Sequence, residues 1–160
     1  FGETDAFINR KVKRALAEGL QPVVCIGETK EQRQAGQTGQ VLKTQIEGSL
    51  AGVSAAEMKK IVVAYEPVWA IGTGLTATPA MAQEAHEHCR RLIAETWSDK
   101  VAQKMPILYG GSVKPDNAKT LMEQPDVDGV LVGGASLTPE AFEKIVNNST
   151  RLNTCKETVP

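Results

Sequence analysis

One segment of the chain reads Ala64-Tyr65-Glu66-Pro67-Val68-Trp69-Ala70-Ile71-Gly72-Thr73-Gly74. It begins in the apolar run 61–64, whose β-branched character is typical of a parallel strand covered on both faces. Glu66 therefore follows the carboxyl end of a strand, the end that carries the chemistry in α/β proteins. A stiff Pro-Val-Trp segment then leads into a glycine-rich tip, which is typical of a general base beneath a movable lid.

Short apolar runs alternate with longer helical stretches along the rest of the chain. Strands are expected near 22–26, 61–65, 107–109 and 129–132. Helices are expected over 5–18 and 40–50, with further starts at Pro79, Pro139 and near 114–116, and a loop or short helical turn over 29–39. Repeated βα units of this kind predict a parallel α/β sheet without an interior linker.

Composition and charge exclude several classes of protein. The chain is 41% hydrophobic and 23% charged, with a formal net charge of -1, which argues against nucleic-acid and anionic-membrane partners. No apolar stretch approaches the roughly 18 residues of a membrane helix, and no signal peptide is visible, so the cytoplasm is expected. Cys25, Cys89 and Cys155 form no CxxC pair, which favours reduced thiols and no metal site.

Four stretches, in this order along the chain, resemble the triosephosphate isomerase family. They are Pro-Val-Val-Cys-Ile-Gly-Glu at 22–28, the segment 64–74, Tyr-Gly-Gly-Ser-Val at 109–113, and Asp-Gly-Val-Leu-Val-Gly-Gly-Ala-Ser-Leu at 128–137. The resemblance covers residues 1–146 and implies a parallel (βα)4 half of a (β/α)8 barrel, beginning at the helix before the fifth strand. A closed barrel typically needs about 250 residues. Residues 147–160 are expected to form a polar tail.

The chemistry that this resemblance implies is the interconversion of dihydroxyacetone phosphate and glyceraldehyde 3-phosphate, a step of glycolysis and gluconeogenesis. Glu66 would move a proton between adjacent carbons through an enediol(ate), with no cofactor and no metal. Phosphate contacts are implied for Gly72, Ser112, Gly133 and Gly134. Glycine loops suit this role because they let backbone N–H groups approach an anion, and barrels of this type hold phosphate after the last two strands.

The resemblance also implies a lid over the base. The lid segment comprises Pro67, Val68, Trp69, Ala70, Ile71, Gly72, Thr73, Gly74, Leu75, Thr76 and Ala77. Glu28 would hold Trp69 when the lid is open, and Tyr109 and Ser112 would hold its tip when it is shut. Taken singly, each signal has a plainer interpretation: a Glu at a strand end as a cap, a Gly-Gly pair as a tight turn, and Trp69 as a core aromatic.

The family's essential electrophilic His, and its Asn and Lys near the amino terminus, have no counterpart in the sequence. His86 and His88 lie two apart on a predicted helix and are interpreted as ordinary surface or partly buried residues. The isolated chain is therefore expected to be inactive. It is expected to bind the amino-terminal half of the barrel or to self-associate. The resemblance also implies a homodimer for the intact enzyme. The alternative is a non-catalytic half-barrel folding or assembly module that retains phosphate-binding loops.

Overall fold

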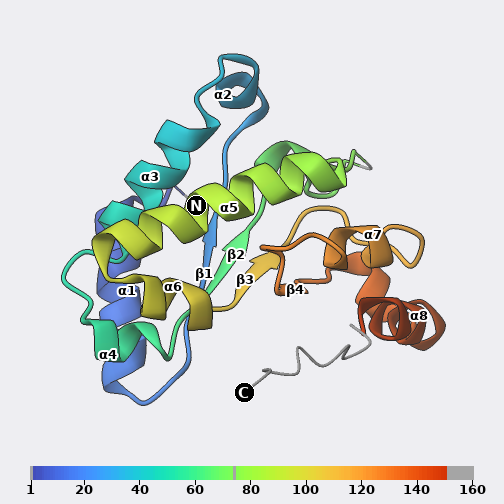
Figure 1. The fold of residues 1–160 in the computed structure, drawn as a ribbon. Helices are drawn as coiled ribbons and strands as arrows, with labels where there is room; N and C mark the ends of the chain where they lie inside the picture. The colour runs from blue at the N-terminus through green and yellow to red at the C-terminus, as the bar shows by residue number, and fades with distance from the viewer. Residues whose placement is uncertain (1, 74, 151–160) are drawn as a thin grey trace, which may run out of the picture.

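A parallel sheet forms the centre of the protein (Figure 1). The computed structural model describes residues 2–73 and 75–150. Within them the four strands pair in the order β1-β2-β3-β4, and every pairing is parallel. The strands are β1 (Val23–Ile26), β2 (Val62–Tyr65), β3 (Ile107–Tyr109) and β4 (Gly129–Val130). Tyr65 is paired with Tyr109, so β2 and β3 end side by side.

The helices connect successive strands, as the alternating sequence pattern predicts. Thr78 caps the longest of them by accepting a hydrogen bond from the Met81 N–H at 3.2 Å, directly before Pro79. Residues 147–149, expected to begin a polar tail, continue the last helix instead. The helices are α1 (Asp5–Ala17), α2 (Lys30–Gln34), α3 (Thr38–Ser49), α4 (Ala55–Met58), α5 (Pro79–Thr96), α6 (Asp99–Lys104), α7 (Ala118–Met122) and α8 (Pro139–Ser149), with 3₁₀ turns η1 (Val68–Ala70) and η2 (Gly134–Leu137).

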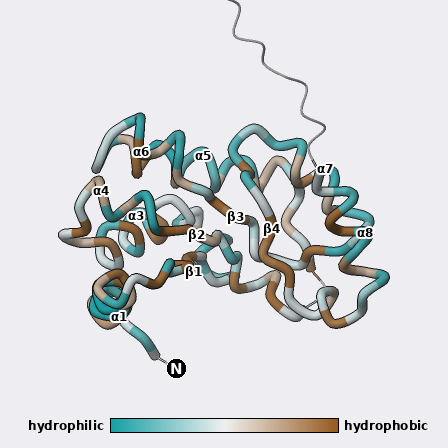
Figure 2. The backbone as a smooth tube through the Cα atoms, turned by 90° about the horizontal axis from the view of Figure 1, so that it is seen from below, coloured by the Kyte–Doolittle hydropathy of each residue, from teal (hydrophilic) through white to brown (hydrophobic). Residues whose placement is uncertain are grey.

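The hydrophobic core lies between the sheet and the helices α3 and α5. Leu42 and Ile46 on α3 and Ile93 on α5 are fully buried against Val63 and Ile107 of the strands. Each such side chain contributes about 1.5–3 kcal/mol when it leaves water. In Figure 2, α3 and α5 lie beside β1, β2 and β3, while α7 and α8 lie beyond β4.

The opposite face of the sheet is open to solvent at β1. Val24 and Ile26 of this strand are buried, whereas Val23 and Cys25, which alternate with them, are exposed. Val23 is 48% exposed although it is a large apolar residue. In the described residues β1 and β4 each pair with one neighbour only, so both edges of the sheet are also free.

Arg90 on α5 is hydrogen-bonded to the residues that precede β4, next to the start of β3. Its guanidinium donates to Asp126 Oδ1 and to Asp128 Oδ2, both at 2.7 Å, and to the Ala102 carbonyl at 2.7 Å. Asp128 also accepts a hydrogen bond from the Ile107 N–H at 2.8 Å. One arginine therefore links α5, α6 and the starts of β3 and β4.

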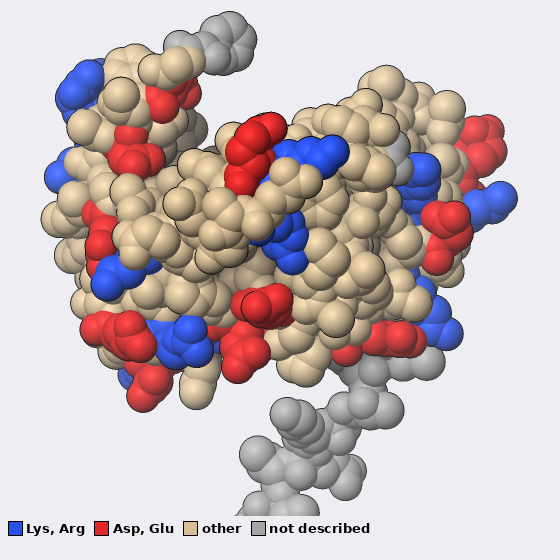
Figure 3. All heavy atoms as spheres, turned by 90° about the horizontal axis from the view of Figure 1, so that it is seen from above, with Lys and Arg blue, Asp and Glu red and all other residues tan. Residues whose placement is uncertain are grey.

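The surface carries charges of both signs. Figure 3 shows Lys and Arg side chains interspersed with Asp and Glu on one face, without a large patch of a single sign. This distribution agrees with the formal net charge of -1. In the part of the chain that the structure describes, the helices are too short or too polar to cross a membrane.

Candidate active site

Glu66 directly follows β2, at the carboxyl end of the sheet. Its backbone N–H donates to the Ile26 carbonyl at 2.7 Å, which fixes the residue beside the end of β1. Two glycines make room for it. A methyl group at Gly27 would lie 1.9 Å from the Glu66 carbonyl oxygen, and one at Gly110 would lie 2.5 Å from Glu66 Cγ. Close backbone approach is thus the reason for glycine at both positions.

Cys25 of β1 is the titratable neighbour of Glu66. Partial burial, followed by the negative charge of Glu66, raises the pKa of the Cys25 thiol to about 11. The thiol is therefore protonated at neutral pH, since its pKa lies far above 7. Sequence reasoning identified Cys25 as a strand residue but not as a neighbour of the base.

A cavity of about 540 Å³ opens beside Glu66. Its wall includes all five residues for which the sequence predicts catalysis or phosphate contact: Glu66, Gly72, Ser112, Gly133 and Gly134. These residues follow the ends of three strands or belong to the lid segment. Glu66 and Gly134, 68 positions apart in the sequence, therefore line the same cavity. The other lining residues include Ile71, which was predicted in the lid segment, and Gly110 and Gly111, which lie in the glycine loop before Ser112. No site role was predicted for the remaining ones, which are Val113, Lys114, Leu131, Val132 and Ala135.

Hydrogen bonds to backbone carbonyls shape the two glycine loops that line this cavity. The Ser136 N–H and hydroxyl both donate to the Gly133 carbonyl, at 2.9 and 2.7 Å, and so turn that carbonyl into the loop. Space around Gly133 and Gly134 is open, with no heavy atom within 4 Å of a methyl group placed on either. Asn117 fixes the other loop by donating to the Ser112 carbonyl at 2.9 Å.

Lys114 supplies a positive charge to the same cavity. Its side chain is exposed at the end of the Ser112 loop, and its backbone N–H donates to Asn117 Oδ1 at 2.8 Å. The cavity is therefore lined by one carboxylate, one ammonium group and several glycines, a combination suited to an anionic substrate with a proton to lose.

A buried carboxylate holds the amino-terminal hinge of the lid segment. Glu28 is fully buried and accepts hydrogen bonds from Trp69 Nε1 at 3.0 Å and from the Tyr65 hydroxyl at 3.0 and 3.1 Å. Burial, followed by the charge of Glu28, raises the pKa of Tyr65 far above its ordinary value. The hydroxyl thus remains a proton donor to Glu28 at any physiological pH.

The carboxyl-terminal hinge rests on the neighbouring strand. The Ala77 N–H donates to the Tyr109 hydroxyl at 3.3 Å. Between the hinges, Thr73 Oγ1 donates to the Trp69 carbonyl at 2.8 Å, and Gly72 has a φ of +67°, which a residue with a side chain rarely adopts. Gly74, predicted at the tip, lies outside the described residues, whereas Gly72 of the tip lines the same cavity as Ser112.

Neither histidine lines this cavity. His86 is fully buried, with its ring 5.8 Å from the Tyr65 ring and Nδ1 3.2 Å from the Asp126 carbonyl, so the interpretation as a surface or partly buried residue is wrong for it. Half-buried His88 has Nε2 3.0 Å from the Gly39 carbonyl and lines a different cavity, between α3 and α5. Among the described residues, no group of three or more His, Cys, Asp or Glu side chains could hold a metal ion.

Comparison with known proteins agrees with this geometry. The profile of the triosephosphate isomerase family matches residues 1–149. The chain is 54% identical over 148 residues to the triosephosphate isomerase of Protochlamydia amoebophila, covering 92% of this chain and 56% of that protein. It is 57% identical over 146 residues to the one from Syntrophotalea carbinolica, covering 91% of this chain and 58% of that protein. The chain thus spans somewhat more than half the length of these curated relatives, and it belongs to the triosephosphate isomerase family.

Proposed function

We propose that this chain carries the catalytic base and the phosphate-binding loops of a triosephosphate isomerase, which interconverts dihydroxyacetone phosphate and glyceraldehyde 3-phosphate in glycolysis and gluconeogenesis. The observation that carries the proposal is the single cavity that brings Glu66 together with Gly72, Ser112, Gly133 and Gly134. Family membership supports it. The proposed place of action is the cytoplasm, and the proposed working protein is a homodimer, as the family resemblance implies.

In this reaction the Glu66 carboxylate accepts a proton from the carbon next to the substrate carbonyl. The electron pair left behind forms the enediol(ate), and Glu66 returns the proton to the adjacent carbon, so the product is an isomer of the substrate. The glycine loops hold the phosphate with backbone N–H groups, and Lys114 adds positive charge at the mouth of the cavity. No cofactor or metal takes part.

The group that stabilises the developing oxyanion comes from outside this chain. Both histidines lie away from the cavity, and losing one oxyanion donor commonly costs about 10²–10³-fold in rate. We therefore propose a (βα)4 half-barrel whose partner is the amino-terminal half of the barrel. The open face and free edges of the sheet favour such a partner.

Isomerase turnover of dihydroxyacetone phosphate in a coupled assay tests this proposal. The chain is assayed alone and then mixed with a chain that supplies the four amino-terminal βα units, and Glu66→Asp in the mixture serves as the control. Activity only in the mixture, lost in the control, is the expected result. Substantial activity of the isolated chain would contradict the need for an external oxyanion donor.

A second candidate function follows from the open sheet face itself. A half-barrel with exposed Val23 and free edges could act as a folding or assembly module that retains phosphate-binding loops without turnover. Inactivity of both the isolated chain and the folded mixture would favour this candidate over the isomerase.

A further inference from the structure

One guanidinium touches both partners of the hydrogen bond at the amino-terminal hinge. Arg33, in the last turn of α2, places its NH1 nitrogen 3.1 Å from Glu28 Oε1. Its Cζ also lies 5.5 Å from the centroid of the Trp69 ring. Trp69 is thus held from two directions, by the carboxylate at its indole N–H and by a cation over its ring.

We propose that Arg33 is a positioning residue for the lid segment, and that it sets how firmly Trp69 is held against Glu28. The inference rests on the proposed function, in which the lid segment moves over Glu66. Its physical basis is separate from the chemistry, because Arg33 does not line the cavity beside Glu66.

The charge of Glu28 explains why an arginine is needed at this point. A fully buried carboxylate is unstable unless it is paired with a cation or well hydrogen-bonded, and its other two partners, Tyr65 and Trp69, are neutral donors. Arg33 supplies the compensating charge. The ion pair with Arg33 does not depend on the Trp69 indole N–H, so Glu28 keeps a cationic partner when Trp69 moves away.

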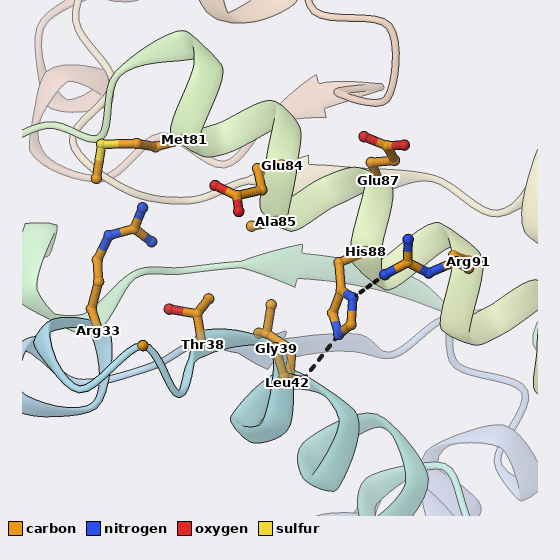
Figure 4. A pocket seen from close by; sticks show the side chains of 11 residues that line it. Arg33, Thr38, Gly39, Leu42, Met81, Glu84, Ala85, Glu87, His88 and Arg91 are labelled. Atoms are coloured by element: carbon orange, nitrogen blue, oxygen red, sulfur yellow. Dashed lines mark hydrogen bonds between the residues drawn. The ribbon is translucent and has the colours of Figure 1, made fainter.

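The surroundings of Arg33 explain how it keeps water from the hinge. Arg33 lines a second cavity, of about 440 Å³, between the α2–α3 segment and α5, and Figure 4 shows its side chain at one end of this space, near Met81. Its side chain is only 22% exposed. Without the guanidinium, water from this cavity would reach Glu28 and compete with the indole N–H.

The same cavity offers a matched control. Arg91 also lines it, but donates to His88 Nδ1 at 2.7 Å rather than to Glu28, as Figure 4 shows. Trp97 provides an internal reference, because its indole N–H donates to the Val53 carbonyl at 2.7 Å, away from the lid segment. These are the two tryptophans of the chain.

Hydrogen exchange of the two indole N–H groups, followed by NMR on the 15N-labelled 160-residue chain, tests the inference. Arg33→Ala should speed exchange at Trp69 about tenfold relative to Trp97, because the variant loses both the ion pair and the ring contact. Arg33→Lys should have a smaller effect, since it keeps the charge but lacks the planar fork. Arg91→Ala should leave the ratio unchanged.

Exchange rates in Arg33→Ala that equal those of the unmodified chain at both Trp69 and Trp97 would overturn the inference. If Arg33→Ala speeds exchange at both tryptophans equally, the variant has lost its fold, and Arg33→Lys becomes the test. Faster exchange at Trp69 alone in Arg33→Lys supports the inference. Unchanged exchange at Trp69 in Arg33→Lys refutes it. Turnover is not part of this measurement. A failed isomerase assay with a positive exchange result would therefore reject the function and leave the role of Arg33 standing.

Discussion

Glu66 lies between Gly27 and Gly110, and a side chain added at these two positions would collide with different parts of Glu66. At Gly110 the obstacle is the Glu66 side chain itself, with Cγ at 2.5 Å and Oε1 at 2.8 Å from an added methyl group. At Gly27 the obstacle is the Glu66 backbone, with the carbonyl oxygen at 1.9 Å. Side chains move at small cost and backbone does not, so the two positions separate catalysis from stability.

Gly110→Ala should displace the Glu66 carboxylate while the fold persists. A displacement of about 1 Å lowers kcat of the barrel completed with its amino-terminal half by about 10²-fold. Steady-state kinetics of the mixture and a urea melt of the chain measure the two effects. Gly129→Ala is the control, because its methyl group meets only the Leu108 side chain. Full activity in Gly110→Ala would show that the carboxylate position tolerates this shift.

Gly27→Ala should instead destabilise the fold, because the ends of β1 and β2 must separate. The expected loss in the free energy of unfolding is about 1–3 kcal/mol or more, as for other overpacked sites. Urea denaturation followed by circular dichroism measures it. A stability equal to that of the unmodified chain would contradict the close approach of Gly27 to Glu66.

His86 makes the stability of the chain depend on pH. Burial lowers the pKa of His86 from 6.5 to about 4, so between these values the unfolded chain binds a proton that the folded chain does not. Stability is therefore fully present above pH 6.5 and falls as the pH drops towards 4, by at most roughly 3 kcal/mol. Urea melts from pH 4 to 8 should show a flatter profile for His86→Gln. Identical slopes below pH 6.5 would refute this contribution.

At the scale of the elements, Arg90 ties α5 and α6 to the starts of β3 and β4. Arg90→Ala leaves Asp126 and Asp128 without their cation, and the expected loss is about 2–4 kcal/mol because the group is only partly exposed. Arg14→Ala is the matched control. It breaks an exposed pair with Glu18 and should cost less than about 0.5 kcal/mol in a thermal or urea melt. Equal losses in both variants would argue against a special role for Arg90.

The sequence predicts the strands because each is a short apolar run whose pattern depends on local composition alone. β1, β2 and β3 lie within one residue of the predicted bounds, whereas β4 ends two residues early, at Val130. The helices α4 and α6 escape prediction because stretches of 4 and 6 residues are too short to show helical periodicity. The predicted start near 114–116 is a turn, and α7 begins at Ala118.

The candidate site is predictable where its residues form a local motif. Glu66 and the glycine loops carry such motifs, and the structure places them around one cavity. Cys25, Arg33 and Lys114 were not predicted as site residues, because their place at the site depends on neighbours distant in sequence, such as Trp69 for Arg33. Pairing of this kind depends on packing between elements, which periodicity and composition do not encode.

At the scale of the whole molecule, the open sheet face predicts self-association when no other partner is present. Val23 is 48% exposed on this face, and both sheet edges are free in the described residues. Sedimentation velocity should show dimers or larger species of the isolated chain. Val23→Lys should weaken association, whereas Leu20→Lys, at an exposed site before β1, should not. A strictly monomeric chain would contradict this prediction.

The reactivity of the exposed Cys25 thiol reports whether the open sheet face is covered by a partner. Its sulfur lies on the side of β1 that a partner would cover, whereas Cys89 is buried within α5. Because its pKa is about 11, the alkylation rate should rise steeply with pH and remain slow near neutrality. Time-resolved alkylation, read by peptide mass spectrometry, would therefore report when the face is occupied without an engineered cysteine.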